Sequence, residues 1–292
     1  MFGALELAPP KRRSAPGAEP KGPVYTPGMS SWTEFVQDAQ PGHAVQVYAD
    51  LDDLARSVAA YLSAGFENGE PAVVVATREH VARIAETLAG AGWDERRIQA
   101  DRLLVLADAD ATLAEFMDGG LPSATRFEAV LGGLLDRVAE RFPRVRIRVF
   151  GEMVDLLVER GQTEAVVRLE QLWNELARRR SFSLLCGYRL DVFDRATQTG
   201  LLPDVCAEHS HVLPAGDPER LSRAVDFALE EVLGPVDAGK VYLLVGERIR
   251  EARVPVGQLV LMWVSANMPG LADRILASAR THYSEPLTAA SS

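Results

Sequence analysis

The chain has 292 residues, of which 47% are hydrophobic and 25% are charged, and it carries a formal net charge of −10 at pH 7. This composition is typical of a soluble globular protein with a sizeable core, and the acidic charge excludes nucleic acid and membranes as expected partners. No apolar run reaches the roughly 18–20 residues that a membrane span needs, and residues 1–27 lack the apolar stretch of a signal peptide. We therefore expect a cytoplasmic protein, in which the two cysteines remain thiols.

The chain is expected to divide into a leader, an α/β domain and a helical subdomain. Residues 1–30 contain six prolines and little apolar periodicity, which predicts a flexible, disordered leader. Residues 31–214 alternate short apolar runs with amphipathic helical patterns, which predicts an α/β fold, a three-layer parallel sheet covered on both faces. Residues 215–292 show helical patterns separated by Gly and Pro, which predict a small helical C-terminal subdomain.

Apolar runs and helical periodicity give the expected order of the elements. Strands are expected at 44–48, 72–77, 103–107, 145–150 and 183–188, with a weaker one at 211–213. Between them, one-sided apolar patterns predict helices that include 51–62 and 127–138, and a helix over 163–179. In the C-terminal region helices are expected at 218–233, 237–251, 255–265 and 269–282, although 241–245 also has a strand-like pattern.

The turn after the first strand excludes a phosphate-binding loop. Residues 48–53 read Tyr-Ala-Asp-Leu-Asp-Asp and include neither glycine nor lysine, whereas a phosphate needs close backbone N–H groups and a cation. Lysine is also absent between Ser30 and Gly239. A P-loop NTPase is therefore excluded, and we expect neither a nucleotide nor another cofactor. Asp50 is predicted to be the N-cap of the following helix.

Ligands of open α/β sheets bind beyond the carboxyl ends of the strands, where several polar side chains are expected here. Glu152 follows the fourth strand, and either it accepts a hydrogen bond from a ligand or it caps the next helix. Tyr48 and Tyr188 end the first and fifth strands, and their rings and hydroxyls suit a pocket for a small, partly apolar ligand. Cys186, on the fifth strand, is predicted to be a small buried hydrophobe.

No metal site and no catalytic residue is predicted. His43 precedes the first strand, at the opposite end from the expected pocket, which indicates a structural role. Residues 206–211 contain the pattern Cys-x-x-His-x-His, but this is not a regular zinc spacing, and no second Cys/His pair lies nearby in the sequence. No Ser–His–Asp or Cys–His arrangement occupies a recognisable strand–turn–helix context, so the chain is not expected to be an enzyme.

The segment His43–Asp50, HAVQVYAD, resembles the H-x-x-x-x-Y-x-D opening of the MEDS family, the methanogen/methylotroph DcmR sensory domain. Further stretches resemble the family in the same order: GEPAVVVAT at 69–77, FGEMV at 150–154, LEQLWN at 169–174, FSLLCGY at 182–188 and CAEHSHVLP at 206–214. The resemblance covers about residues 41–214.

This resemblance implies a bacterial signalling sensor whose fold is related to RecA/KaiC ATPases but lacks their phosphate loop. Its ligand is expected to be a small molecule, such as a hydrocarbon derivative, and residues 215–292 are expected to relay binding to a signalling protein or within a homodimer. The ligand-binding residues that the resemblance implies are Tyr48, Asp50, Glu152, Trp173, Asn174, Cys186 and Tyr188. For Trp173 the helical spacing alone indicates a place in the core. The alternative function is a ligand-free protein-interaction module, or scaffold, of a regulatory pathway.

Overall fold

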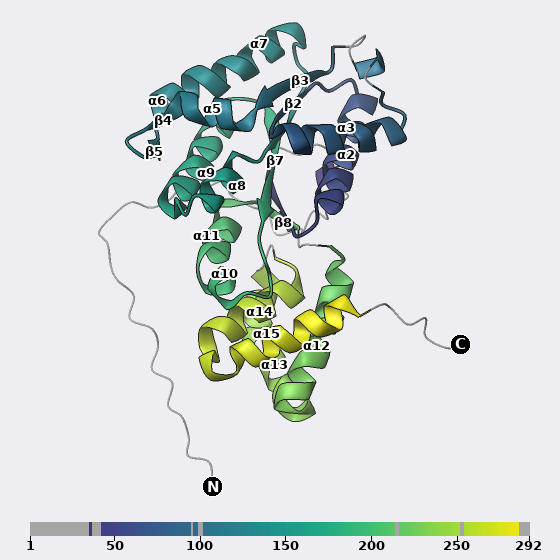
Figure 1. Cartoon of the computed structure of the whole chain (residues 1–292), viewed down its shortest axis with the longest axis vertical. Coiled ribbons are helices and arrows are strands. Elements are labelled where there is room, and N and C mark those ends of the chain that lie inside the picture. The colour runs from purple at the N-terminus through teal and green to yellow at the C-terminus, as the bar shows by residue number, and fades with distance from the viewer. Residues whose placement is uncertain are drawn as a thin grey trace.

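A parallel sheet with helices on both faces lies above a separate group of helices in Figure 1. The computed structural model describes residues 35–36, 42–94, 96–98, 102–213, 216–251 and 254–285, without the side chains of residues 247–251. The predicted leader, residues 1–30, lies outside these described residues.

The central sheet, as far as the chain is described, has six strands in the order β3-β2-β6-β7-β1-β8. Every neighbouring pair is parallel. The strands are β1 (His43–Tyr48), β2 (Ala72–Ala76), β3 (Leu104–Asp108), β6 (Ile147–Gly151), β7 (Phe182–Arg189) and β8 (His211–Leu213). The inner strands β1, β2 and β6 are buried along their whole length, because parallel strands with helices on both faces have no solvated side.

Side chains alternate between two separate cores on the two faces of the sheet. One face packs against α2 (Leu51–Glu67) and α3 (Arg78–Gly90). The other packs against α5 (Ala109–Phe116), α7 (Gly133–Arg141), α8 (Met153–Glu159), α9 (Thr163–Ala177) and α11 (Leu201–Glu208). This arrangement confirms the three-layer α/β fold that the hydrophobic pattern predicts.

Two features of the α/β unit differ from the predicted elements. The pattern at 127–138 is not one α-helix, because α6 (Ala124–Phe127) continues through a π-helical turn (Glu128–Gly132) into α7. A short hairpin, β4 (Met117–Asp118) and β5 (Leu121–Pro122), is additional. Both are local backbone features that leave the apolar periodicity nearly unchanged, so the pattern does not reveal them.

The C-terminal helices form their own hydrophobic core. They are α12 (Pro218–Leu233), α13 (Pro235–Glu251), α14 (Val256–Asn267) and α15 (Pro269–Ser284). Residues 241–245 belong to α13, so their strand-like pattern is resolved as helix. Of the helices within the described ranges, none combines the length and apolar character needed to span a bilayer. That residues 31–214 and 215–292 are separate domains stays a prediction.

The segment after β7 connects the sheet to these helices. It leads into α10 (Arg195–Thr199), where the buried Gln198 accepts a hydrogen bond of 2.9 Å from Gln258 Nε2 of α14. Asp191, at the start of the same segment, pairs with Arg280 of α15 at 2.6 Å. The segment after β7 is therefore joined to α14 and α15 by side-chain contacts.

Candidate functional site

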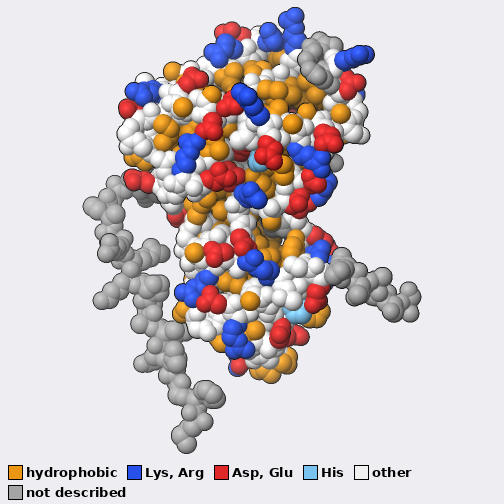
Figure 2. Space-filling view, in the orientation of Figure 1, with side chains coloured by type: hydrophobic (Ala, Val, Ile, Leu, Met, Phe, Trp, Pro, Cys, Tyr) orange, Lys and Arg blue, Asp and Glu red, His pale blue; other side chains and the backbone are white. Residues whose placement is uncertain are grey.

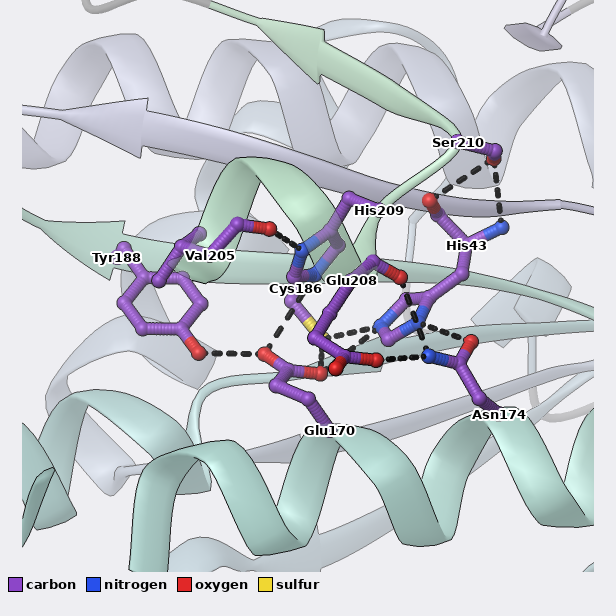
Figure 3. Close-up of polar contacts among 9 residues, drawn as sticks. All are labelled: His43, Glu170, Asn174, Cys186, Tyr188, Val205, Glu208, His209 and Ser210. Carbon is purple, nitrogen blue, oxygen red and sulfur yellow. Dashed lines mark hydrogen bonds and ion pairs between the residues drawn. The ribbon is translucent and has the colours of Figure 1, made fainter. Parts of the chain in front are cut away.

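The side chains predicted to bind a ligand fall into two groups and two isolated positions. Tyr48 and Glu152 lie together at the carboxyl edge of the sheet. Asn174, Cys186 and Tyr188 belong to a buried polar cluster between the sheet and α9, shown in Figure 3. The remaining two, an aspartate and a tryptophan, join neither group.

At the carboxyl edge, Tyr48 is bound to an acid that the sequence did not reveal. Its hydroxyl donates to Asp155 Oδ2 of α8 at 2.7 Å, and Asp155 Oδ1 accepts from the backbone N–H of Arg189 at 2.8 Å. Burial, followed by the charge of Asp155, raises the pKa of Tyr48, so the hydroxyl stays protonated and remains the donor. Asp155 thus joins β1 to the end of β7.

Glu152 is 1% exposed and links the end of β6 to the turn between β2 and α3 at the same edge. Its carboxylate accepts hydrogen bonds from the backbone N–H of Thr77 and from Nδ1 of His80, near the start of α3. Glu152 is the N-cap residue of α8, as the capping interpretation expects, but its side chain makes no capping hydrogen bond there. The turn between β2 and α3 comes close enough to hydrogen-bond with both carboxylate oxygens of Glu152.

We expect the stability of the chain to fall as the pH rises above about 6.5, because of His80. The hydrogen bond to Glu152 raises the pKa of His80 above its ordinary value of 6.5, helped by the charges of Asp155 and Glu79. The stabilisation by protonated His80 is complete below the unfolded pKa and is lost as the pH passes the folded pKa. Urea unfolding measured across this range should show the decline.

The variants that test this pH dependence change the two residues of the His80–Glu152 pair and a neighbouring residue of α3. His80→Gln and Glu152→Gln should each remove most of the slope, whereas Glu79→Gln, at an exposed neighbouring carboxylate, should keep most of it. An unchanged slope in His80→Gln would show that another group causes the pH dependence.

The buried polar cluster is centred on Glu170 of α9. Its Oε1 accepts from the hydroxyl of Tyr188 at 2.5 Å, and its Oε2 lies 3.1 Å from Nε2 of His43. Sγ of Cys186 lies 3.2 Å from the same His43 nitrogen, and His209 Nε2 lies 3.5 Å from Glu170 Oε1. His43, Glu170, Cys186 and His209 are all buried, and each can present a ligand atom within 4.8 Å of the others.

Both imidazoles of the cluster are oriented by hydrogen bonds outside it. His43 Nδ1 lies 3.0 Å from Oδ1 of Asn174, and the amide nitrogen of Asn174 donates to Glu208. His209 Nδ1 lies 2.6 Å from the carbonyl oxygen of Val205, which can only accept. His209 therefore carries its proton on Nδ1, and in both rings Nε2 points into the cluster (Figure 3).

Burial sets the protonation of the cluster. It lowers the pKa of His209 to about 4, so this ring is neutral at pH 7, and it raises the pKa of Cys186 well above that of an ordinary thiol. Burial alone would also raise the pKa of Glu170, but His209, His43 and the donated hydrogen bonds outweigh it and lower the pKa. The result is an ionised carboxylate facing a neutral thiol and a neutral imidazole.

Sequence reasoning did not assign His43, Glu170 or His209 to a common site. His43 is the first residue of β1, at the amino end as expected, and its side chain enters the cluster. The signal for Glu170 is an acidic residue on the apolar face of α9, next to Leu169 and Trp173, where a carboxylate needs buried partners.

Asp50 and Trp173 have local roles. Asp50 caps α2, as predicted, by accepting from the N–H groups of Asp52 and Asp53 at 2.7 and 3.3 Å, and it is exposed. Trp173 is 1% exposed and packs edge-on against Phe127, with ring centroids 5.2 Å apart. These positions match a helix cap and a core residue, and ligand contact by any of the predicted residues stays a prediction.

An apolar cavity of about 790 Å³ lies on the other face of the sheet from the cluster. It is formed by α3, the segment after it, and strands β2 and β3, in the upper part of Figure 2 where hydrophobic side chains reach the surface. Its charged lining residues are Arg102 and Arg141. Its lining also includes Leu62, Val74, Val81, Ile84, Ala85, Leu88, Ala89, Trp93, Ile98, Leu104 and Leu106.

Comparison with known proteins agrees with the sequence motifs. The profile of the family described as MEDS, the MEthanogen/methylotroph, DcmR Sensory domain, matches residues 42–203, which is more than half of the chain. A search of curated proteins gives no match. The matched range includes the sheet from β1 to β7, the carboxyl edge and all of the buried cluster except His209. The chain therefore belongs to the MEDS family of sensory domains.

Proposed function

We propose that this chain senses a small, largely apolar molecule and passes the signal through its C-terminal helices to a protein partner. The observation that carries the proposal is the apolar cavity of about 790 Å³ in a member of a sensory family. Pockets for small molecules usually have about 300–1,000 Å³ and mostly apolar walls with a few polar groups. The cavity therefore has the size and chemistry of a ligand site.

The lining of the cavity suggests the class of ligand. An apolar cavity of about 150 Å³ already accommodates benzene, so this cavity suits a molecule larger than a one-carbon compound. Arg102 and Arg141 would attract an anionic or electronegative end group such as a carboxylate or a halogen. We infer a hydrocarbon derivative with an apolar body and one such group.

A chain of contacts supports relay from the cavity to the C-terminal helices. α3 forms one wall of the cavity and carries His80, which binds Glu152 at the carboxyl edge. Asp155, three residues further on at the same edge, holds the backbone of Arg189 at the end of β7. The segment after β7 then reaches α14 through Gln198. Tyr48 and Glu152 would accordingly act in transmission, without direct contact to a ligand in the cavity.

The turn after β1 supports a binding function and argues against nucleotide hydrolysis. The side chain of Asp50 already accepts from the N–H groups that begin α2, which are the donors a phosphate would use. Its negative charge would also repel a phosphate at this position. We infer that the domain works by binding and not by catalysis.

The partner surface is proposed to lie on α12 and α13. Large hydrophobic side chains of these helices are exposed: Phe227 (57%), Val236 (72%), Leu243 (81%) and Leu244 (61%). Hydrophobic side chains also reach the surface at the lower end of the molecule in Figure 2. The same surface favours the second candidate function, a scaffold that binds its partner without a ligand. The two functions differ in whether partner binding depends on the ligand.

The test is a thermal-shift screen of the full chain with medium-chain carboxylates and haloalkanes. A ligand at 100 times its Kd should stabilise the chain by about 2.7 kcal/mol. Ala85→Trp fills the cavity from an exposed position of α3 and should abolish the shift. Ala82→Trp, at an exposed position of the same helix outside the cavity, should keep it. Hydrogen exchange of α14 should change only when the ligand binds.

Two outcomes would contradict the sensor proposal. If no compound of either class raises the melting temperature, the cavity is not a site for them. If Ala85→Trp and Ala82→Trp respond equally, the ligand binds elsewhere. A partner that binds equally well with and without a stabilising ligand would favour the scaffold function.

A further inference from the structure

We propose that His43, Glu170, Cys186 and His209 form a binding site for a divalent transition metal ion, with Zn²⁺ as the best fit. These four residues come from β1, α9, β7 and the residue after α11, and Figure 3 shows their side chains facing one another. The site lies on the opposite face of the sheet from the apolar cavity, and it is independent of the proposed ligand.

The distances between the donor atoms fit tetrahedral coordination. Zinc binds nitrogen and oxygen at about 2.0–2.2 Å and sulfur at about 2.3 Å, so tetrahedral ligands lie roughly 3.3–3.6 Å apart. His43 Nε2 lies 3.1 Å from Glu170 Oε2 and 3.2 Å from Cys186 Sγ. Cys186 Sγ lies 3.8 Å from Glu170 Oε2, and His209 Nε2 lies 3.5 Å from Glu170 Oε1. All four ligand atoms lie within 4.8 Å of one another, so a separation at that limit would have to shorten by about 1 Å for the four residues to enclose an ion.

The unpartnered nitrogen of His209 is the second observation that points to a metal. His209 is 0% exposed, and its Nε2 has no hydrogen-bond partner. Because Nδ1 donates to the carbonyl of Val205, Nε2 presents a lone pair, and Oε1 of Glu170 lies 3.5 Å from it. Two lone pairs facing each other in a buried site repel, whereas a cation between them would satisfy both.

The surrounding hydrogen bonds are those that zinc-binding histidines usually have. Such a histidine donates its other ring N–H to a carbonyl or carboxylate, which fixes the ring and its tautomer. Asn174 Oδ1 and the carbonyl of Val205 take these positions for His43 and His209. A hydrogen-bonded network without metal would explain the contact of His43 with Glu170, but it would leave Nε2 of His209 without a partner.

Charge balance also suits a dication. On binding, the thiol of Cys186 would lose its proton to solvent, and the resulting thiolate and the Glu170 carboxylate would neutralise a divalent ion. Nitrogen, sulfur and carboxylate donors in a tetrahedral set favour zinc over calcium or magnesium, which prefer oxygen. With four protein ligands the site is closed, as in structural zinc sites. The ion would fix the end of α11 against β1 and β7.

The experiment uses the full chain and two metals. Metal analysis of the purified protein should give one zinc ion per chain, and chelation should lower the melting temperature. After removal of zinc, Co²⁺ should restore stability and give the visible absorption of tetrahedral cobalt with a thiolate-to-cobalt charge-transfer band. His209→Gln and Cys186→Ser should bind at least tenfold more weakly, and Cys186→Ser should lose the thiolate band.

The matched controls separate coordination from folding. The chain has two cysteines, so a thiolate band that persists in Cys206→Ser must come from Cys186, even if Cys186→Ser does not fold. Asn174→Ala should keep the band but weaken binding roughly 10–100-fold. The proposal is overturned if the chain holds no metal and neither ion changes its melting temperature or absorption, or if the band survives in Cys186→Ser. Neither result would affect the apolar cavity.

Discussion

Arg148→Met is expected to lower the free energy of unfolding by about 3–5 kcal/mol, because it leaves a carboxylate and two carbonyls without their donor. Arg148 lies within β6 and is 0% exposed. Its Nε donates to Glu70 Oε2 at 2.6 Å, and its Nη1 donates to the carbonyl oxygens of Val36 and Tyr61 at 2.6 and 2.8 Å. One guanidinium therefore joins the sheet to α2 and to the segment at residues 35–36.

Urea unfolding followed by circular dichroism is the measurement. Arg137→Met, on the exposed side of α7, should stay within about 0.5 kcal/mol of the parent chain. The double variant Glu70→Gln/Arg148→Met should recover part of the loss, since much of the cost is an unpaired charge at Glu70. A loss below about 1 kcal/mol in Arg148→Met would mean that water replaces these hydrogen bonds and that the pairing contributes little.

Arg148 also shows where sequence patterns reach their limit. The strand itself is predictable, because a continuous apolar run is typical of a parallel strand that helices cover on both faces. A buried arginine within it interrupts the pattern without a visible reason. Its space is provided by Gly65 of α2, where a Cβ atom would lie 2.5 Å from Arg148 Cδ. Such complementarity between positions far apart in sequence is invisible until the two elements are packed.

The same reasoning explains which part of the site was predictable. The parallel order of the strands places Tyr48 and Glu152 at one edge, and residue types after each strand are enough to expect that. The buried cluster requires side chains from four segments, and the spacing of residues 206–211 compares only neighbours along the chain, so it could not bring these four side chains together. Of that segment, His209 belongs to the cluster, with its ligand atom within 4.8 Å of Cys186 Sγ, and Cys206 does not.

Trp173→Ala is expected to lower the free energy of unfolding by about 3–5 kcal/mol. It removes the largest side chain of the hydrophobic core between the sheet and α9. The indole packs between Phe127 and Phe182, with ring centroids 5.2 and 5.9 Å from its own. A cavity lined by rigid aromatic rings collapses poorly, which places the loss at the upper end for core truncations. Thermal and urea unfolding of the full chain measure it directly.

A milder pair of variants decides whether Trp173 or Trp93 belongs to the ligand site. Trp173→Phe keeps an aromatic ring in the core and should retain the ligand-induced thermal shift, although its baseline melting temperature falls. Trp93 lines the apolar cavity and stacks under Arg97, 3.6 Å from its ring centroid, and Trp93→Phe should reduce the shift. The reverse result would move the ligand from the α3 face to the α9 face, next to the buried cluster. Equal thermal shifts in both variants would mean that the ligand binds on neither face. Because both changes exchange the same residue types, the size of the substitution cannot account for a difference between them.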